Sequence, residues 1–219
     1  MHPARPGFCR GNRAVLLARG CKMRLGDGYF DVPAGKIAAI VTSLVMTAPP
    51  PHRPERSSAA WRLERIRHPE PDWYRALFRR VGSQWLWFSR LQLSDCALRA
   101  IIEDPEVEIY RLTEADDEAG FLELDFRETG SCELSFLGLD PARIGTGAGR
   151  WLMNRAIEIA WSRSISRFWV HSCTLDHPAA LGFYIRSVFQ PFRRQIEIAD
   201  DPRLCGLIAP EAATQMPLL

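Results

Sequence analysis

A glycine-rich loop between a β-rich stretch and an amphipathic helix constrains this chain more than any other feature. The loop reads Arg143-Ile-Gly-Thr-Gly-Ala-Gly-Arg150, with three glycines at alternate positions. A backbone without Cβ atoms can approach a ligand closely, and the first N–H groups of a helix point outward at the positive end of its dipole. The loop is therefore a candidate site for an anion such as a pyrophosphate. Glycines that only let a helix approach a sheet are the structural alternative.

The spacing of the glycines argues against a dinucleotide-binding fingerprint. That motif needs G-x-G-x-x-G directly after a parallel strand. Counting from Gly145, the sixth position is Arg150, and counting from Gly147 it is Leu152. The strand before the loop also belongs to an antiparallel series. A nicotinamide or flavin enzyme is therefore disfavoured.

The rest of the pattern predicts a single mixed α/β core. Asp72 and Ser94 each stand before a helical apolar pattern, in the position of an N-cap. Further helices are expected at about 147–162 and 178–187. Strands are expected at 37–46, 61–66, 107–112, 121–126, 132–139, 166–173 and 189–198, of which the three between 107 and 139 form an antiparallel meander. With 219 residues, one core with extra segments is favoured over two small domains.

We expect three parts along the chain: a basic, disordered extension at 1–32, a folded domain at 33–200 and an unstructured tail at 201–219. The first 25 residues carry six basic side chains, and no acid precedes Asp27. A transit-like leader and an RNA-binding arm are the alternatives for this extension. The remainder is mildly acidic, and phosphate-backbone binding needs a basic face rather than a basic tail, so nucleic-acid binding is disfavoured.

Composition also bears on the compartment. The longest candidate apolar run, Ile37 to Val41, is far short of the roughly 18 residues that span a bilayer, so an integral membrane protein is not expected. The six cysteines are scattered without C-x-x-C spacing, and no secretory signal is recognised. Free thiols in a reducing cytoplasm are the expected state.

The second half of the chain resembles the GCN5-related N-acetyltransferase superfamily. The meander, the glycine loop with its helix, and the later run Asp176-His-Pro-Ala-Ala-Leu-x-Phe-Tyr-x-Arg-x-Val-Phe189 occur in the order typical of that superfamily. The resemblance covers 106–195 well and 37–105 loosely. It implies a mixed, mostly antiparallel sheet flanked by helices and split between its two central strands, where coenzyme A enters.

The resemblance also implies the residues that hold acetyl-CoA as a co-substrate. In the superfamily a (Gln/Arg)-x-x-Gly-x-(Gly/Ala) loop binds the pyrophosphate through backbone amides. Here Ile144 stands where Gln or Arg is usual, with Arg143 one place early. The residues expected to contact the cofactor are Leu137 and Leu139 on the preceding strand, Ile144, Gly145, Thr146, Gly147, Ala148, Gly149 and Arg150 in the loop, and Asp176 in the later motif.

Two catalytic roles follow from the same resemblance. Tyr184 corresponds to the tyrosine that protonates the departing thiolate, and Glu133 to a glutamate base. A base is needed because removing the proton of a lysine-like ammonium at pH 7 costs about 4.6 kcal/mol. Glu123 on the neighbouring strand is the substitute base. Strand alternation places Glu133 and Ser135 on one face, opposite Leu134 and Phe136.

The acceptor is left open by the sequence. Aromatic residues before the meander, Trp85 and Trp87 among them, lie where the superfamily roofs its acceptor pocket, and an indole face attracts an ammonium. These two residues and Glu123 are the candidate substrate contacts. A small-molecule amine or a protein lysine fits the mildly acidic body, and a homodimer is compatible with the sequence.

A metal site is not expected. His171, Cys173 and His177 lie close together in the sequence, but no fourth ligand has matching spacing. A packed cysteine and histidines near the coenzyme A arm are the favoured interpretation.

Three rival functions remain open. Ile144 and Val188 replace motif residues, so an acyl-CoA-binding regulator or scaffold with weak catalysis is the main alternative. A structural module without a cofactor and a nucleic-acid-binding protein are the others.

Overall fold

The computed structural model describes residues 26–55 and 60–219. Contacts within the chain divide it between Asp31 and Val32. Of the first unit only 26–31 are described, and these residues form neither helix nor strand. The disorder predicted for 1–32 therefore lies mostly outside the described residues. No helix in the described ranges is long and apolar enough to cross a membrane.

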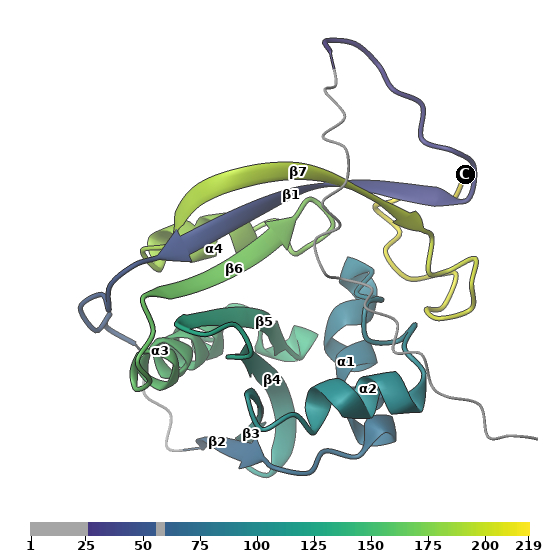
Figure 1. Cartoon of the computed structure of the whole chain (residues 1–219). Helices are drawn as coiled ribbons and strands as arrows, with labels where there is room; N and C mark the ends of the chain where they lie inside the picture. Colours follow the sequence, from purple (N-terminus) through teal and green to yellow (C-terminus); the bar gives the residue numbers. More distant parts are fainter. Residues whose placement is uncertain (1–25, 56–59) are drawn as a thin grey trace, which may run out of the picture. The chain divides into compact units, whose positions relative to one another are not determined.

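The helices and strands of the unit Val32–Leu219 lie close to their predicted positions (Figure 1). The strands are β1 (Lys36–Met46), β2 (Trp61–Ile66), β3 (Val107–Glu114), β4 (Asp117–Asp125), β5 (Ser131–Leu139), β6 (Arg167–Cys173) and β7 (Gln190–Asp200). The helices are α1 (Pro71–Gly82), α2 (Asp95–Ile102), α3 (Ala148–Trp161) and α4 (Ala180–Arg186), with short 3₁₀ turns at Ser83–Trp85 and Pro141–Arg143.

The described strands form one sheet in the order β2-β3-β4-β5-β6-β1-β7. Neighbouring strands are antiparallel except β5 and β6, which run parallel on either side of the α3 crossover. β1, the first strand in the chain, lies between β6 and β7. The fold is therefore the mixed, mostly antiparallel α/β architecture that the sequence predicted.

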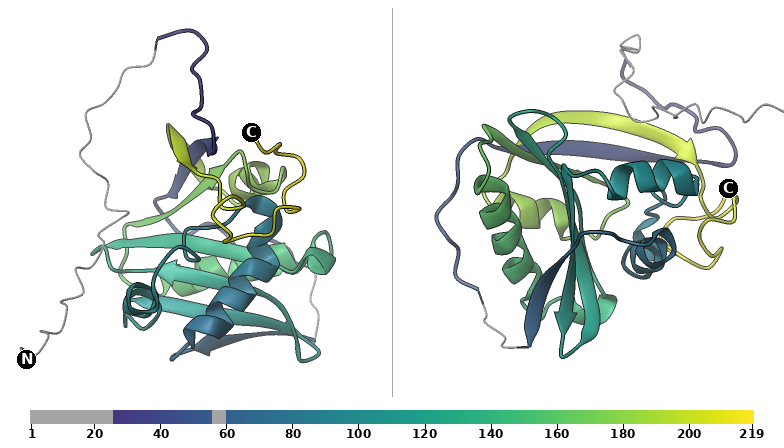
Figure 2. Two further views of the ribbon diagram at one scale, coloured as in Figure 1. Left: turned by 90° about the vertical axis from the view of Figure 1, so that its right-hand side faces the viewer. Right: turned by 60° about the horizontal axis from the view of Figure 1, so that its bottom comes forward.

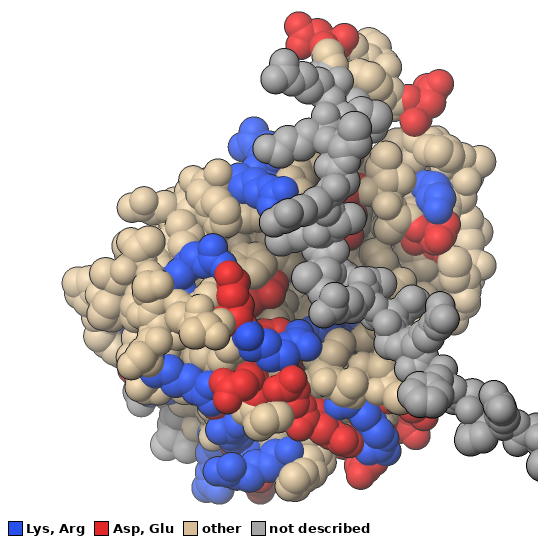
Figure 3. Space-filling view, viewed as in Figure 1, with Lys and Arg blue, Asp and Glu red and all other residues tan. Residues whose placement is uncertain are grey.

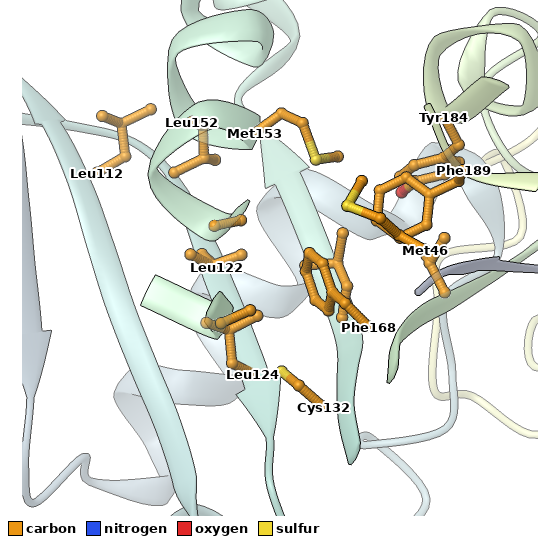
Figure 4. Close-up of a cluster of buried hydrophobic side chains, with 14 of the residues drawn as sticks. Met46, Leu112, Leu122, Leu124, Cys132, Leu152, Met153, Phe168, Tyr184 and Phe189 are labelled. Atoms are coloured by element: carbon orange, nitrogen blue, oxygen red, sulfur yellow. The ribbon is translucent and has the colours of Figure 1, made fainter. Parts of the chain in front are cut away.

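Helices cover both faces of the sheet (Figures 1 and 2). α3 and α4 pack on one face over a core that includes Leu122, Leu134 and Phe168. Figure 4 shows this core, with Tyr184 and Phe189 at its α4 end. α1 and α2 pack on the other face, over a second core around Phe78 and Phe121. Both faces of the central strands are consequently buried.

The sheet splits between β5 and β6. The two strands pair only where 131–133 face 167–169, and beyond Glu133 and Trp169 they separate. This confirms the predicted split. Between 134 and 139, the edge of β5 that faces β6 pairs with no residue of β6, so its backbone groups are open to another extended chain.

A bulge in β5 corrects the predicted alternation. Glu123 of β4 pairs with Phe136 and the next residue, Leu124, pairs with Leu134, so Ser135 is an extra residue without a direct partner. Leu134 therefore belongs to the core under α3, whereas Phe136 packs on Phe78 on the α1 face. The prediction that Leu134 and Phe136 share a face was wrong.

The two predicted N-caps behave differently. Ser94 accepts a hydrogen bond from the backbone N–H of Ala97, 3.3 Å away, which confirms it as the cap of α2. Asp72 lies inside the first turn of α1, because the helix already begins at Pro71, whose fixed φ and missing N–H suit the first helical position. Glu70 is the flanking residue, so the predicted Asp72 cap was wrong.

Residues 201–219 form turns rather than a helix or strand, but they pack against the domain. The buried Arg203 pairs with Asp201, with Nη2 and Oδ2 2.7 Å apart, and donates to the carbonyl of Met216. Ile208 and Ala213 belong to the core under α1. The segment predicted to be an unstructured tail therefore contributes apolar contacts to that core.

Candidate active site

A cavity of about 690 Å³ opens where β5 and β6 separate. Its walls come from the β5 segment 134–139, the glycine loop, β6, α4 and the segment 85–89 after α1. Eleven of the predicted site residues line it: Trp85, Trp87, Leu137, Leu139, Ile144, Gly145, Gly147, Gly149, Arg150, Asp176 and Tyr184. Glu123, Glu133, Thr146 and Ala148 do not.

The glycine loop leaves the start of α3 uncapped. Gly145 and Gly147 have φ of 85° and 106°, backbone conformations that side chains other than glycine rarely adopt. Gly147 is the N-cap residue, and no side chain caps the helix there. Gly149 and Arg150 follow at the second and third helical positions, whose N–H groups have no acceptor within a helix. The loop thus presents free backbone donors at a cavity wall.

Thr146 and Ala148, two of the loop residues predicted to contact the cofactor, also shape the loop. The hydroxyl of Thr146 donates to the carbonyl of Arg143 at 2.8 Å and accepts the N–H of Ala148 at 3.3 Å. Ala148, the first residue of α3, is fully buried in the core. Neither lines the cavity.

A group of arginines surrounds the start of α3. Arg150 stacks on the ring of Phe183 and donates to the hydroxyl of Ser187 at 3.0 Å. Burial lowers the pKa of Arg150, and the positive charges of Arg53 and Arg186 lower it further. Such mutual repulsion between cations, next to free backbone donors, is suited to binding an anion of high charge.

Arg53 is a residue near the site that sequence reasoning missed: its charge acts on Arg150, although Arg53 does not line the cavity. It lies in the connection after β1, and its carbonyl accepts a hydrogen bond from the side chain of the buried Asn154 on α3 at 2.8 Å. Asn154 also contacts the carboxylate of Glu55 at 2.5 Å. Nothing in the local sequence links this connection to α3, so no signal predicted it.

Tyr184 lines the cavity from α4. It packs between Phe183 and Phe189 in the core under α3 and α4. Burial raises the pKa of its hydroxyl well above the ordinary value, and the negative charge of Asp176 raises it further. Within the described residues the hydroxyl makes no hydrogen bond to another side chain, so this neutral proton donor faces the cavity unengaged.

Glu133 reaches the cavity only through a histidine. Its Oε1 lies 3.4 Å from Nδ1 of His171 on β6, and His171 lines the cavity. The hydrogen bond to Glu133 raises the pKa of His171, and the nearby charges of Asp176 and Glu197 act in the same direction. Because Glu133 pairs with Trp169, it lies beside His171 on the α1 face of the sheet, opposite the face that buries Tyr184.

Glu123, the substitute base, is fully enclosed on β4. Its carboxylate accepts a hydrogen bond from the hydroxyl of Tyr74 and another from Arg90, with Nη2 and Oε1 2.6 Å apart. Arg90 in turn stacks on Phe136, a cavity residue. The structure thus places Glu123 behind the cavity wall, where it fixes the segment after α1.

Trp87 and Asp176 connect two sides of the cavity. The indole N–H of Trp87 donates to Oδ1 of Asp176 at 2.9 Å. Asp176 also accepts from the hydroxyl of Ser172 and the N–H of Cys173. Trp85 contacts the ring of His177 at the rim. Trp87 is therefore part of the wall itself, whereas Trp85 is freer to meet a substrate.

No group of three or more potential metal ligands occurs in the part of the chain that the structure describes. Burial raises the pKa of the Cys173 thiol to about 11, with a further contribution from Asp176. The thiol is therefore protonated at neutral pH and is poorly suited to nucleophilic attack.

The sequence profile described as Acetyltransferase (GNAT) family matches residues 61–188. This match covers more than half of the chain, so the chain belongs to the GNAT acetyltransferase family. No curated protein matches the sequence.

Solved structures share the fold at low sequence identity. A GCN5-related N-acetyltransferase from Sphaerobacter thermophilus is 11% identical, with a TM-score of 0.52 over 77% of this chain and 53% of that chain. A protein assigned to the GNAT family from Novosphingobium aromaticivorans DSM 12444 is 16% identical, with a TM-score of 0.51 over 76% and 67%. A conserved protein of unknown function from Staphylococcus epidermidis ATCC 12228 is 10% identical, with a TM-score of 0.51 over 76% and 63%. This chain thus spans between about half and two thirds of their lengths.

Proposed function

We propose that this chain transfers an acetyl group from acetyl-CoA to a primary amine, by direct attack within a ternary complex in the cytoplasm. The observation that carries the proposal is the cavity between β5 and β6, which joins the uncapped glycine start of α3 to the buried Tyr184 hydroxyl. Family membership supports acyl transfer as the class of reaction.

The residues present fit acetyl-CoA. The N–H groups of Gly149 and Arg150 at the start of α3, with the guanidinium groups of Arg150 and Arg186 on the cavity wall, suit a pyrophosphate. The unpaired edge of β5 at Leu137 and Leu139 suits the amide groups of the pantetheine arm. Acetyl-CoA supplies an activated thioester with a thiol leaving group.

The acid and base of the proposed reaction approach the split from opposite faces of the sheet. On the α1 face, Glu133 and His171 receive the proton that the attacking ammonium must lose. On the α4 face, the neutral hydroxyl of Tyr184 gives a proton to the sulfur as the C–S bond breaks and the C–N bond forms. His171 is the member of the Glu133–His171 pair that lines the cavity, so it is the first proton acceptor and Glu133 orients it.

The acceptor is proposed only by class. The cavity rim between Trp85 and His177 is aromatic, and Asp176 and Glu197 add negative charge to its wall. A cationic amine, either a small molecule or a protein lysine, matches this combination.

Release of free thiol tests the proposal. The full chain is incubated with acetyl-CoA and a panel of polyamines, amino acids and lysine peptides. We expect amine-dependent thiol release that His171→Gln reduces and that Arg62→Gln, an exposed substitution on β2, leaves unchanged. Binding of acetyl-CoA without release for any amine would instead support an acyl-CoA-binding regulator, which the exposed Ile144 at the usual Gln or Arg position favours.

A further inference from the structure

β7 leaves one long edge of the sheet open. It pairs with β1 on one side and is the last strand of the sheet on the other. Residues 190–198 are all exposed, so neither of its faces is covered there by the described residues. Phe192, Ile196 and Ile198 are each at least half exposed. Figure 3 shows uncharged residues predominating over the ends of β1, β6 and β7. An exposed edge with apolar side chains is a template for another strand.

The neighbouring strand extends the apolar surface. Ile40 of β1 pairs with Ile196 and is also exposed, so both side chains lie on the same face of the sheet. α4 packs on β1 and β6 beside them and exposes Leu181 and Ile185. Pro191 and the register shift beside it, between Ser43 and Leu44 of β1, protect the beginning of the β7 edge. From Arg193 onward the described edge has no proline or register shift, and the charged residues Arg193, Arg194 and Glu197 decide which strand can pair with it.

The charge pattern of β7 is complementary to itself. In an antiparallel pair, opposing residues both direct their backbone groups toward the partner or both direct them away. In a symmetric pair of two identical strands, the two-fold axis must therefore pass through a residue that faces its own copy. The axis cannot pass between two residues. Pairing about Gln195 places Arg193 opposite Glu197, twice by symmetry, and Arg194 opposite Ile196.

The neighbouring registers either oppose like charges or pair no opposite charges. Pairing about Arg194 places that arginine opposite itself. The register about Glu197 sets Arg194 opposite Asp200 but also sets Glu197 opposite itself. Pairing about Ile196 opposes no charges of opposite sign. Like charges directly opposite destabilise a strand pair, and opposite charges stabilise it. Among these registers, only the one about Gln195 pairs opposite charges and separates like ones.

We propose that β7 is a dimer interface, where β7 of a second copy of this chain pairs antiparallel about Gln195. The sheet then continues across both copies, and Ile196 and Ile198 are covered. Glu197 also lines the cavity, so the second copy brings its Arg193 to the rim of each active site. The interface therefore adds a positive charge beside Glu197. This inference does not depend on acetyl transfer.

Sedimentation velocity of the full chain, from 1 to 100 μM, tests the interface. We expect a dimer. Arg193→Glu sets glutamates opposite each other and should shift the chain to monomer, while the double variant Arg193→Glu, Glu197→Arg restores the opposite charges and should restore the dimer. Arg62→Glu alters the other edge of the sheet, at β2, and should leave the dimer intact.

Each other outcome overturns the proposal. A wild-type chain that is monomeric at 100 μM would show that no such dimer forms. A dimer that persists in Arg193→Glu but dissociates in Arg62→Glu would place the interface at β2. A double variant that stays monomeric while its melting temperature matches the wild type refutes the register about Gln195. Circular dichroism melting of every variant verifies that the chain is folded.

Discussion

The indole of Trp87 and the carboxylate of Asp176 meet across the cavity, with Nε1 and Oδ1 2.9 Å apart, although 89 residues separate them in the chain. This hydrogen bond joins the segment after α1 to the connection between β6 and α4. One contact between two connecting segments therefore bounds the cavity beside the core under α1.

Replacing Trp87 by phenylalanine should loosen this wall. Most of the ring volume is kept, but Asp176 loses one of its three donors. Because Asp176 is only half-buried, the lost hydrogen bond should cost about 0.5–1.5 kcal/mol. Urea unfolding should show a loss of that size. Trp73→Phe is a control for the general cost of losing an indole donor, because Trp73 donates to Glu118 away from the cavity. Equal losses together with unchanged acetyl-CoA affinity would contradict a role for Trp87 in the wall.

Gly138 should not tolerate a side chain. A Cβ there would lie 2.8 Å from Cγ2 of Val81 and 3.2 Å from the ring of Trp87. Overpacking of this kind costs about 1–3 kcal/mol, so Gly138→Ala should lower the midpoint of urea unfolding. At Gly26 a Cβ meets nothing within 4 Å, and Gly26→Ala is expected to have no effect. If Gly138→Ala leaves the midpoint of urea unfolding unchanged, α1 packs less closely on β5.

Glu123 should act as a structural anchor rather than as a base. Glu123→Ala leaves the guanidinium of Arg90 buried without a counter-ion, which costs about 3–5 kcal/mol. The exposed pair of Glu64 and Arg111 is the comparison, and Glu64→Ala should cost less than about 1 kcal/mol. Similar unfolding free energies for the two variants would show that Arg90 finds another partner or water.

His171 should titrate above the ordinary histidine value of about 6.5. Because its folded pKa is raised, the pair with Glu133 stabilises the fold below about pH 6.5, and this stabilisation is lost as pH rises through the folded pKa. Histidine NMR should therefore show a lower pKa for His171 in Glu133→Gln, and the stability difference between the two proteins should shrink at alkaline pH. An unchanged pKa of His171 in Glu133→Gln would show that Glu133 does not interact with His171.

The same titration should govern turnover once an acceptor is known. A base must be neutral to accept a proton, so kcat/KM should rise with pH through the pKa of His171. In Glu133→Gln this rise should move to lower pH. If Glu133→Gln loses activity but the pH dependence of its kcat/KM does not move, Glu133 has a different role.

Tyr184→Phe should lower kcat about 100-fold or more, the range typical of a lost general acid, without weakening acetyl-CoA binding. The ring contacts with Phe183 and Phe189 do not involve the hydroxyl. Tyr110→Phe is the matched control, because the hydroxyl of Tyr110 bonds Glu108 on β3, and its kcat should be unchanged. An active Tyr184→Phe would exclude Tyr184 as the acid.

Local patterns predicted most of the fold, because the apolar periodicities of helices and strands and the residues that form turns act over short distances. The position of β1 was not predictable in this way, since its partners β6 and β7 lie more than 120 residues further along the chain. The bulge at Ser135 was also missed. A single extra residue leaves the composition of a strand unchanged but exchanges the faces of every side chain after it.

The site was predicted as far as it is encoded in contiguous residues. The glycine loop and the Tyr184 motif are local signals, and the structure brings them to one cavity. The contact between Glu133 and His171 depends on the parallel register of β5 and β6, and the location of Arg53 depends on a hydrogen bond from Asn154. Both arise from packing between distant segments.

Thermal unfolding with and without acetyl-CoA tests the central claim most directly. At 100 times its Kd a ligand stabilises by about 2.7 kcal/mol, which raises Tm by roughly 5–11 °C for a chain of this size. The wild type should show a rise with acetyl-CoA and none with NADH. Gly147→Asn and Gly147→Asp introduce a side chain at the same strained φ of 106° and differ mainly in charge, so Gly147→Asn should keep a rise with acetyl-CoA. Gly147→Asp places a carboxylate at the anion site and should abolish the rise. No shift for the wild type at millimolar acetyl-CoA, or equal shifts for Gly147→Asn and Gly147→Asp, would contradict the account.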